Sequence, residues 1–172
     1  QNLAYLLIIL VQNNPQVLPS LGEFIAIMQQ WYLEGKENPN GYQLMLSNIA
    51  SAYLTFFANG LDMNTDLLNE AISEFPPFDT HETEPMLLNL AKIFSSTTIP
   101  LPTLEIAAFA LAKFFILNEE DLKKRKVTPE LIGVAQQIFR TIASSNPQII
   151  QQVLAKYSNS QVKTAKLTSI LS

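Results

Sequence analysis

Two similar segments constrain the fold of this 172-residue chain more than any other feature. Asn14-Pro15-Gln16-Val17-Leu18 and Asn146-Pro147-Gln148-Ile149-Ile150 lie 132 positions apart, which is three steps of 44. In each segment Asn can cap a helix, and Pro suits the first helical position because its missing N–H would have no partner there. A spacing of 44 is typical of a repeated helix pair. We therefore expect helix breaks near positions 58 and 102, where the sequence has Ala58-Asn59-Gly60 and Pro100-Leu101-Pro102.

Hydrophobic periodicity predicts helices throughout the chain. The first helices of successive pairs are predicted at 2 to 12, 41 to 58, 81 to 96 and 128 to 144, and the second helices at 15 to 33, 64 to 75, 103 to 117 and 147 to 157, with a final helix at 160 to 171. This order predicts an all-α fold, a right-handed α-α superhelix of the HEAT or armadillo type with about four helix pairs plus a final helix. We interpret residues 1 to 172 as one solenoid segment of a longer chain.

Glycine and proline mark the predicted helix ends. Gly35 and Gly60 lie where a helix end favours a left-handed residue, and Pro76-Pro77 stops a helix.

The apolar run from Leu3 to Val11 could form a strand instead of a helix, but no other part of the chain alternates with period two. This run has nine residues, and about 20 are needed to span a bilayer, so no membrane segment is predicted. Because the chain begins on an apolar helix, we expect that a preceding repeat has been lost.

The composition argues against catalysis. The chain has no cysteine and only one histidine, His81, so neither a nucleophile and base pair nor a zinc site is expected. The five glycines are scattered and form no phosphate-binding loop. The segment from Asp62 to Asp66 imitates part of a calcium loop, but Leu67 and Ser73 replace the required Gly and Glu. We therefore predict a protein that is not an enzyme and needs no cofactor or metal.

Charge divides the chain at residue 123. The part before it has 14 acidic and three basic side chains, a formal charge of −11, and the rest has eight basic side chains against Glu130 alone, a charge of +7. Within the acidic part, Asp62, Asp66, Glu70 and Glu74 recur every four residues and are predicted to follow one face of a helix. This acidic stripe is our candidate surface for a basic partner. The alternative is a solvated helix face with no binding role.

Two further motifs have both a functional and a structural interpretation. The basic run Lys123-Lys124-Arg125-Lys126 could bind nucleic acid, but no aromatic residues are interleaved with it. We interpret this basic run as a solvated loop between repeats and predict no nucleic-acid partner.

Trp31 and Tyr32 could anchor a partner, although aromatic residues at a helix end more often pack between repeats.

Several segments resemble the importin β type karyopherins. Gln1-Asn2-Leu3-Ala4-Tyr5 is similar to their Arg-Asn-x-Ala-Tyr helix, and Asn48-Ile49-Ala50-Ser51-Ala52 to their Asn-x-x-x-Ala helix. The segment Leu68 to Glu84, a helix ending in Phe75-Pro76 and followed by an acidic cluster, is similar to a helix of that family that ends in Leu-Pro. Leu101-Pro102 followed by Leu104-Glu105-Ile106-Ala107-Ala108-Phe109-Ala110 completes the same order of elements. Together these patterns resemble the C-terminal HEAT repeats of a divergent nuclear import receptor.

The resemblance implies a role in nuclear transport, in the cytoplasm and the nucleus. In this family, protein cargo and the GTPase Ran are held on the inner surface, which the second helices line, and Phe-Gly nucleoporin repeats bind between the outer helices. The acidic stripe would then face basic cargo. Two alternatives remain open at this point: a HEAT-repeat scaffold subunit of a phosphatase, coat or other multiprotein complex, and a helical enzyme, which a pocket with clustered perturbed side chains would reveal.

Overall fold

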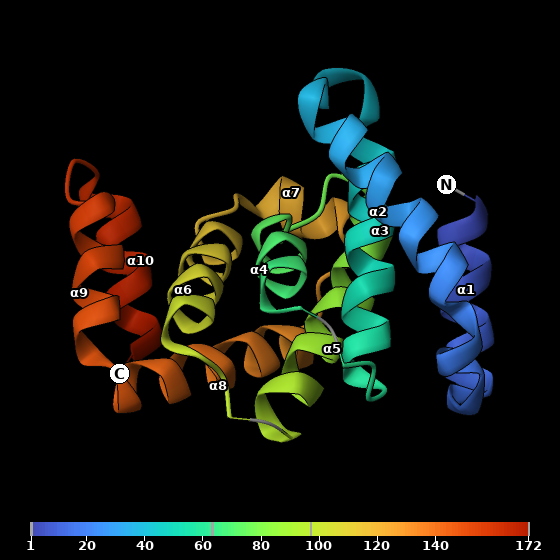
Figure 1. The fold of residues 1–172 in the computed structure, drawn as a ribbon. Helices are drawn as coiled ribbons and strands as arrows, with labels where there is room; N and C mark the ends of the chain where they lie inside the picture. The colour runs from blue at the N-terminus through green and yellow to red at the C-terminus, as the bar shows by residue number, and fades with distance from the viewer. Residues whose placement is uncertain (1, 63, 97, 172) are drawn as a thin grey trace.

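The computed structural model describes residues 2–62, 64–96 and 98–171 and is shown in Figure 1. Its first helices are α1 (Asn2–Asn13), α3 (Pro39–Ala58), α5 (Thr83–Ser96) and α8 (Pro129–Ser145), and its second helices are α2 (Gly22–Glu37), α4 (Thr65–Ser73), α6 (Leu101–Phe115) and α9 (Pro147–Lys156). A short helix α7 (Glu119–Lys124), a final helix α10 (Gln161–Leu171), and two 3₁₀ segments, η1 (Pro15–Leu21) and η2 (Thr80–Glu82), complete the order. The described residues contain no strand, so the all-α prediction is confirmed and the strand alternative for Leu3 to Val11 is wrong.

The helices pack in two layers. The first helices contact one another in chain order, α1 with α3, α3 with α5 and α5 with α8. In the second layer α4 contacts α6 and α6 contacts α9, and Figure 1 shows these three helices side by side. Helix α2 packs against α3, and α10 packs against α6, α8 and α9. Helix α2 reaches α4 through the side chains of Tyr32 and Lys36, which contact Glu70. Since the other helices pack directly on their counterparts in the next pair, the pairs are stacked, as the period of 44 predicts.

The Asn-Pro segments do start helices in the same way, but not by the predicted side-chain cap. Asn14 has φ −149° and ψ 82°, Asn146 has φ −141° and ψ 70°, and neither side chain makes a capping hydrogen bond. A third Asn-Pro pair at Asn38-Pro39 has the same conformation, with φ −135° and ψ 67°. The residue before a proline is driven out of the helical region, so it is the proline that fixes the helix start.

The structure differs from the predicted helices at several places. The second helix of the first pair begins as the 3₁₀ segment η1, because Pro19 within it cannot donate the N–H that an α-helix needs. Gly35 lies inside α2 rather than at its end, and a Cβ there would come within 2.9 Å of the Met45 Cε atom, so this glycine permits close packing against α3. The basic run, predicted as a loop, belongs partly to the helix α7. Gly60 does end α3 with a positive φ of 93°, as predicted.

Helix α3 is the most deeply buried element. Its side chains are buried at nearly every position from Leu46 to Ala58, and it contacts α1, α2, α4 and α5. The largest fully buried side chains on it are Tyr53, Leu54 and Phe56. Each such side chain stabilises the fold by about 1.5 to 3 kcal/mol relative to exposure. Helix α3 therefore holds the first two helix pairs to the third.

Exposed apolar side chains concentrate at the opposite end from α10. Helix α1 exposes Tyr5, Leu6, Ile9 and Leu10, and α2 exposes Phe24, Ile27 and Trp31. Inner helix pairs of a stack are covered on both sides, whereas these two helices have a neighbouring pair on one side only. The expectation of a preceding repeat stays a prediction.

A row of polar contacts joins α3 to α5 and to the segment before it. We call this row the polar ladder. On α3, Ser47 Oγ accepts from Phe78 N (2.8 Å), Asn48 Nδ2 donates to Asp79 Oδ2 (3.3 Å) and Thr55 Oγ1 accepts from Asn89 Nδ2 (2.9 Å). Just after the helix, Asn59 Oδ1 accepts from Lys92 Nζ (3.0 Å). Such bonds contribute about 1 kcal/mol each and fix the register of the two helices, because a shift would leave buried polar atoms unpaired.

Glu82 lies near Ser51 and Asp79 and is only 7% exposed. Burial raises the pKa of its carboxyl above the ordinary value of 4.5, and the nearby charge of Asp79 adds to the rise. The Ser51 hydroxyl opposes part of the rise, although its oxygen makes no hydrogen bond of ordinary length. The folded protein therefore binds this proton more tightly than the unfolded chain does.

We predict that Glu82→Gln stabilises the protein near pH 7. Because the folded pKa is raised, the stability gained from protonation is fully present below about pH 4.5 and is lost as the pH rises through the folded pKa. A neutral Gln removes this loss, so the free energy of unfolding, measured by urea denaturation from pH 4 to 8, should decline less with pH in the variant. Glu84→Gln changes an exposed carboxylate at the start of α5 and is the matched control. An equal change in both profiles would contradict the burial explanation.

Candidate partner-binding surface

The four predicted site residues lie along α4 but not all within it. Asn64 begins the helix, and its Oδ1 accepts a hydrogen bond from Asp66 N at 2.8 Å. Asp66 and Glu70 belong to the helix, whereas Asp62 precedes it and Glu74 follows its last residue. The helix is shorter than the predicted 64 to 75 because Pro76 and Pro77 prevent its continuation.

Helix α2 divides the acidic stripe into two halves. Lys36 Nζ lies 3.1 Å from Glu70 Oε2 and 3.2 Å from Glu74 Oε1, so one lysine bridges both carboxylates. Partial burial disfavours the charged form of Lys36, but the hydrogen bonds to Glu70 and Glu74 raise its pKa above 10.5. Asp62 and Asp66 make no ion pair with any residue in the described ranges, and both are exposed. Only this half of the stripe presents uncompensated charge.

Tyr32 fixes the position of Glu74. Its side chain is 1% exposed, and its hydroxyl donates to Glu74 Oε1 at 3.1 Å and lies 3.3 Å from the Glu70 carbonyl oxygen. Burial, together with the charges of Glu74 and Glu70, raises the pKa of this hydroxyl far above its ordinary value. Its ring packs edge-on against Tyr53, 6.3 Å between centroids. Tyr32 therefore packs between helices, as predicted, while Trp31 beside it stays 37% exposed.

We predict that Tyr32→Phe lowers the free energy of unfolding by about 1 to 2 kcal/mol, because Glu74 loses a buried hydrogen-bond donor. Tyr53→Phe is the matched control: Tyr53 is also 1% exposed, but its buried hydroxyl has no hydrogen-bond partner. Removing that hydroxyl should leave the stability unchanged or increase it. Urea denaturation of both variants measures the difference, and an equal loss in the two would contradict the assigned role of the Tyr32 hydroxyl.

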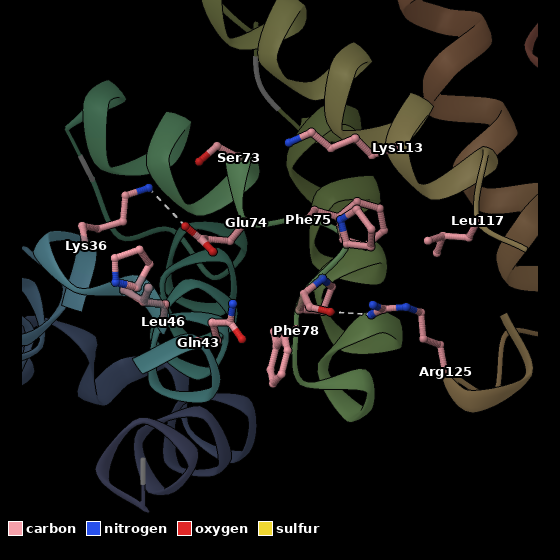
Figure 2. A pocket seen from close by; sticks show the side chains of 13 residues that line it. Lys36, Gln43, Leu46, Ser73, Glu74, Phe75, Phe78, Lys113, Leu117 and Arg125 are labelled. Atoms are coloured by element: carbon pink, nitrogen blue, oxygen red, sulfur yellow. Dashed lines mark hydrogen bonds and ion pairs between the residues drawn. The ribbon is translucent and has the colours of Figure 1, made fainter. Parts of the chain in front are cut away.

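A cavity of about 520 Å³ lies beside Glu74, between the second and third helix pairs (Figure 2). Its walls come from α2, α3, the segment between α4 and η2, the end of α6 and the residue after α7. The lining residues are Lys36, Pro39, Gln43, Leu46, Ser73, Glu74, Phe75, Pro76, Pro77, Phe78, Lys113, Leu117 and Arg125. Figure 2 shows Lys36 and Glu74 on one side of this space and Arg125 on the other, with Phe78 between them.

Helix α7 places Arg125 in the cavity wall. Asn118 caps the helix by accepting from Asp121 N at 2.8 Å, and the helix closes with Lys126 at φ 52° and with Val127 N donating to Leu122 O. Arg125 Nη1 then donates to the Pro77 carbonyl oxygen and to Thr83 Oγ1, the second at 3.1 Å. The sequence interpretation of this basic run as solvated was therefore wrong for Arg125, which joins α7 to the start of α5.

Charge along the second helices is ordered from one end to the other. Asp66 lies in the first turn of α4, and exposed Glu105 lies near the start of α6. The last turns of α2, α6 and α9 contain Lys36, Lys113 and Lys156. Acidic groups near helix starts and basic groups near helix ends are both favoured by the helix dipoles. We call Asp62, Asp66 and Glu105 the acidic margin and the helix ends with Lys36, Lys113 and Lys156 the basic margin, although Glu37 and Glu74 also lie at these ends. Only the acidic margin was predicted, and there only Asp62 and Asp66.

Three further observations concern metal ligands, the histidine and membrane helices. No group of three or more potential ligands for a metal ion occurs in the described ranges. His81 is exposed in η2. None of the helices that the structure describes is long and apolar enough to cross a membrane.

Comparison with known proteins found no matching family model, no matching curated protein and no matching solved structure. The similarity to karyopherins therefore rests on the sequence patterns described above. Any function must be argued from the surface itself.

Proposed function

We propose that this chain is a protein-binding segment of an α-solenoid, in which the layer of second helices holds a basic stretch of another polypeptide. The observation that carries the proposal is the exposed pair Asp62 and Asp66, which have no cationic partner in the described part of the chain. Glu105 on the neighbouring helix α6 is exposed as well, so the negative charge extends over two helix pairs. Adjacent carboxylates of this kind attract Lys and Arg side chains and speed their association.

The finer architecture that we propose is a right-handed superhelix of the HEAT or armadillo type. Two features support it: the contacts of α1, α3, α5 and α8 in turn and of α4, α6 and α9 in turn, and the period of 44 between equivalent Asn-Pro helix starts. In such a solenoid the second helices line one continuous surface, on which an extended polypeptide can contact several pairs at once.

We further propose that the parent protein is a nuclear import receptor of the karyopherin β type, acting between cytoplasm and nucleus. The support for this is the order of sequence patterns from Gln1 to Ala110. Its partners would then be basic protein cargo, Ran and Phe-Gly nucleoporins, and it would be neither an enzyme nor a nucleic-acid-binding protein. The acidic margin of α4 and α6 suits cargo rich in Lys and Arg.

We predict that Asp66→Lys weakens the binding of an octalysine peptide by about tenfold at low salt, since it replaces an attraction with a repulsion. The difference should shrink above 0.1 M salt, where the screening length falls below about 10 Å. Glu84→Lys makes the same charge reversal on the layer of first helices and should change the affinity far less. Isothermal titration at several salt concentrations measures both. Equal effects of the two variants would remove Asp66 from the binding surface.

The proposed transport role has its own test. Basic cargo bound to the full-length parent protein should be released when Ran loaded with GTP is added, and retained when Ran carries GDP. Retention of the cargo under both conditions would contradict the proposal of an import receptor and favour a HEAT-repeat scaffold.

A further inference from the structure

The cavity beside Glu74 has a charge balance opposite to that of the acidic margin. Three cationic side chains line it, Lys36, Lys113 and Arg125, against one carboxylate, that of Glu74. Lys36 is compensated, because it pairs with both Glu70 and Glu74. Neither Lys113 nor Arg125 has a carboxylate within 4.0 Å in the described part of the chain. Two positive charges around one cavity therefore lack an ion-pair partner in the described part of the chain.

The two uncompensated cations lie in different surroundings. Lys113 is exposed in the last turn of α6 and makes no hydrogen bond or ion pair with a described residue, so its ammonium group is available to a ligand. Arg125 is held by Pro77 and Thr83, and its Nε atom is buried without a partner. Burial lowers the pKa of the guanidinium although the charge of Asp121 acts in the opposite direction, which means that its charge is poorly solvated in this site. A bound anion would offset the free-energy cost of this poorly solvated charge.

Apart from Gln43 and Ser73, the other side chains of the wall are apolar. Pro76, Pro77 and Leu117 line the cavity, and the ring of Phe78 is 58% exposed at its edge. The backbone N–H of Phe78 donates to Ser47 Oγ, so the polar ladder holds this segment in place. The volume of about 520 Å³ lies within the range of known ligand sites, roughly 300 to 1,000 Å³, and is large enough for side chains of a bound peptide.

We propose that this cavity binds acidic side chains of a partner polypeptide, with Lys113 and Arg125 as two separate cations and Phe78 as the contact for a neighbouring apolar residue. Charge complementarity identifies the ligand class as a carboxylate-bearing peptide. This site lies at the basic margin of the second helices, so it is separate from the acidic margin that would hold a basic segment. It depends on neither a nuclear role nor a basic partner.

The test uses the acetylated and amidated peptide Gly-Glu-Phe-Glu-Gly with the full 172-residue chain. Its binding is followed by NMR through the backbone amide shifts of Phe78 and Leu117. We expect saturable shifts, and a Gln-for-Glu version of the peptide should bind about tenfold more weakly. Equal binding of the uncharged peptide would overturn the proposal. So would inorganic phosphate that binds as tightly as the peptide, since the site would then select a small anion.

Three variants separate charge recognition from general damage to the fold. Lys113→Gln should weaken peptide binding about fivefold and Lys113→Glu by more, because the exposed lysine supports no other contact. Glu74→Gln should strengthen binding, because it removes the one carboxylate in the cavity wall. Lys123→Gln is the matched control: it removes a charge from an exposed lysine outside the cavity and should change little. The proposal is wrong if Lys113→Glu binds the peptide as tightly as the unsubstituted chain does, or if Glu74→Gln weakens binding.

The outcomes distinguish this site from the proposed function. Loss of octalysine binding in Asp66→Lys concerns the acidic margin only, whereas loss of acidic peptide binding in Lys113→Glu concerns the cavity only. Either proposal can therefore fail while the other holds.

Discussion

The structure depends on the burial of α3 between its neighbours. This helix contacts α1, α2, α4 and α5, and most of its side chains from Leu46 onward are buried. Apolar residues such as Tyr53 and Phe56 provide most of the favourable free energy, because burial of each contributes a few kcal/mol. The polar ladder adds less stability, but it aligns α3 with α5. That alignment sets the segment from Glu74 to Asp79, which forms part of both the acidic stripe and the cavity wall.

The proposed binding surface follows from this arrangement. With α3 in place, α2 and α4 lie close enough for Lys36 to bridge Glu70 and Glu74 and for Tyr32 to bond Glu74. That leaves Asp62 and Asp66 exposed at one margin and Lys113 uncompensated at the other. The same packing that neutralises half of the stripe therefore creates a surface with two charge signs, suited to a polypeptide that carries both.

The helices were predictable because their signals are local. Proline fixes the predicted helix starts at Pro15 and Pro147 whatever the tertiary context, and Gly60 ends α3 through its positive φ. Pro39 starts α3 in the same way, two residues before the predicted start at 41. Gly35 was misplaced because its role is a close approach to Met45, a contact between helices that sequence spacing does not reveal. The pairing of Lys36 with the stripe and the position of Arg125 were missed for the same reason: each joins residues about 35 to 50 positions apart. The one sequence signal for the cavity was Pro76-Pro77-Phe78, a rigid turn that leaves an aromatic ring exposed.

Native-state hydrogen exchange tests the central role of α3 most directly. If this helix holds the stack together, its amides between Ile49 and Phe56 should exchange among the slowest in the chain, at a rate set by global unfolding. The amides of α5 that face it should lose their protection from exchange in the same unfolding event. Helices α1 and α10, which are packed on fewer sides, should exchange faster. Exchange of α3 at the rate of α10, or protection that is greatest in the terminal helices, would contradict this view of the fold.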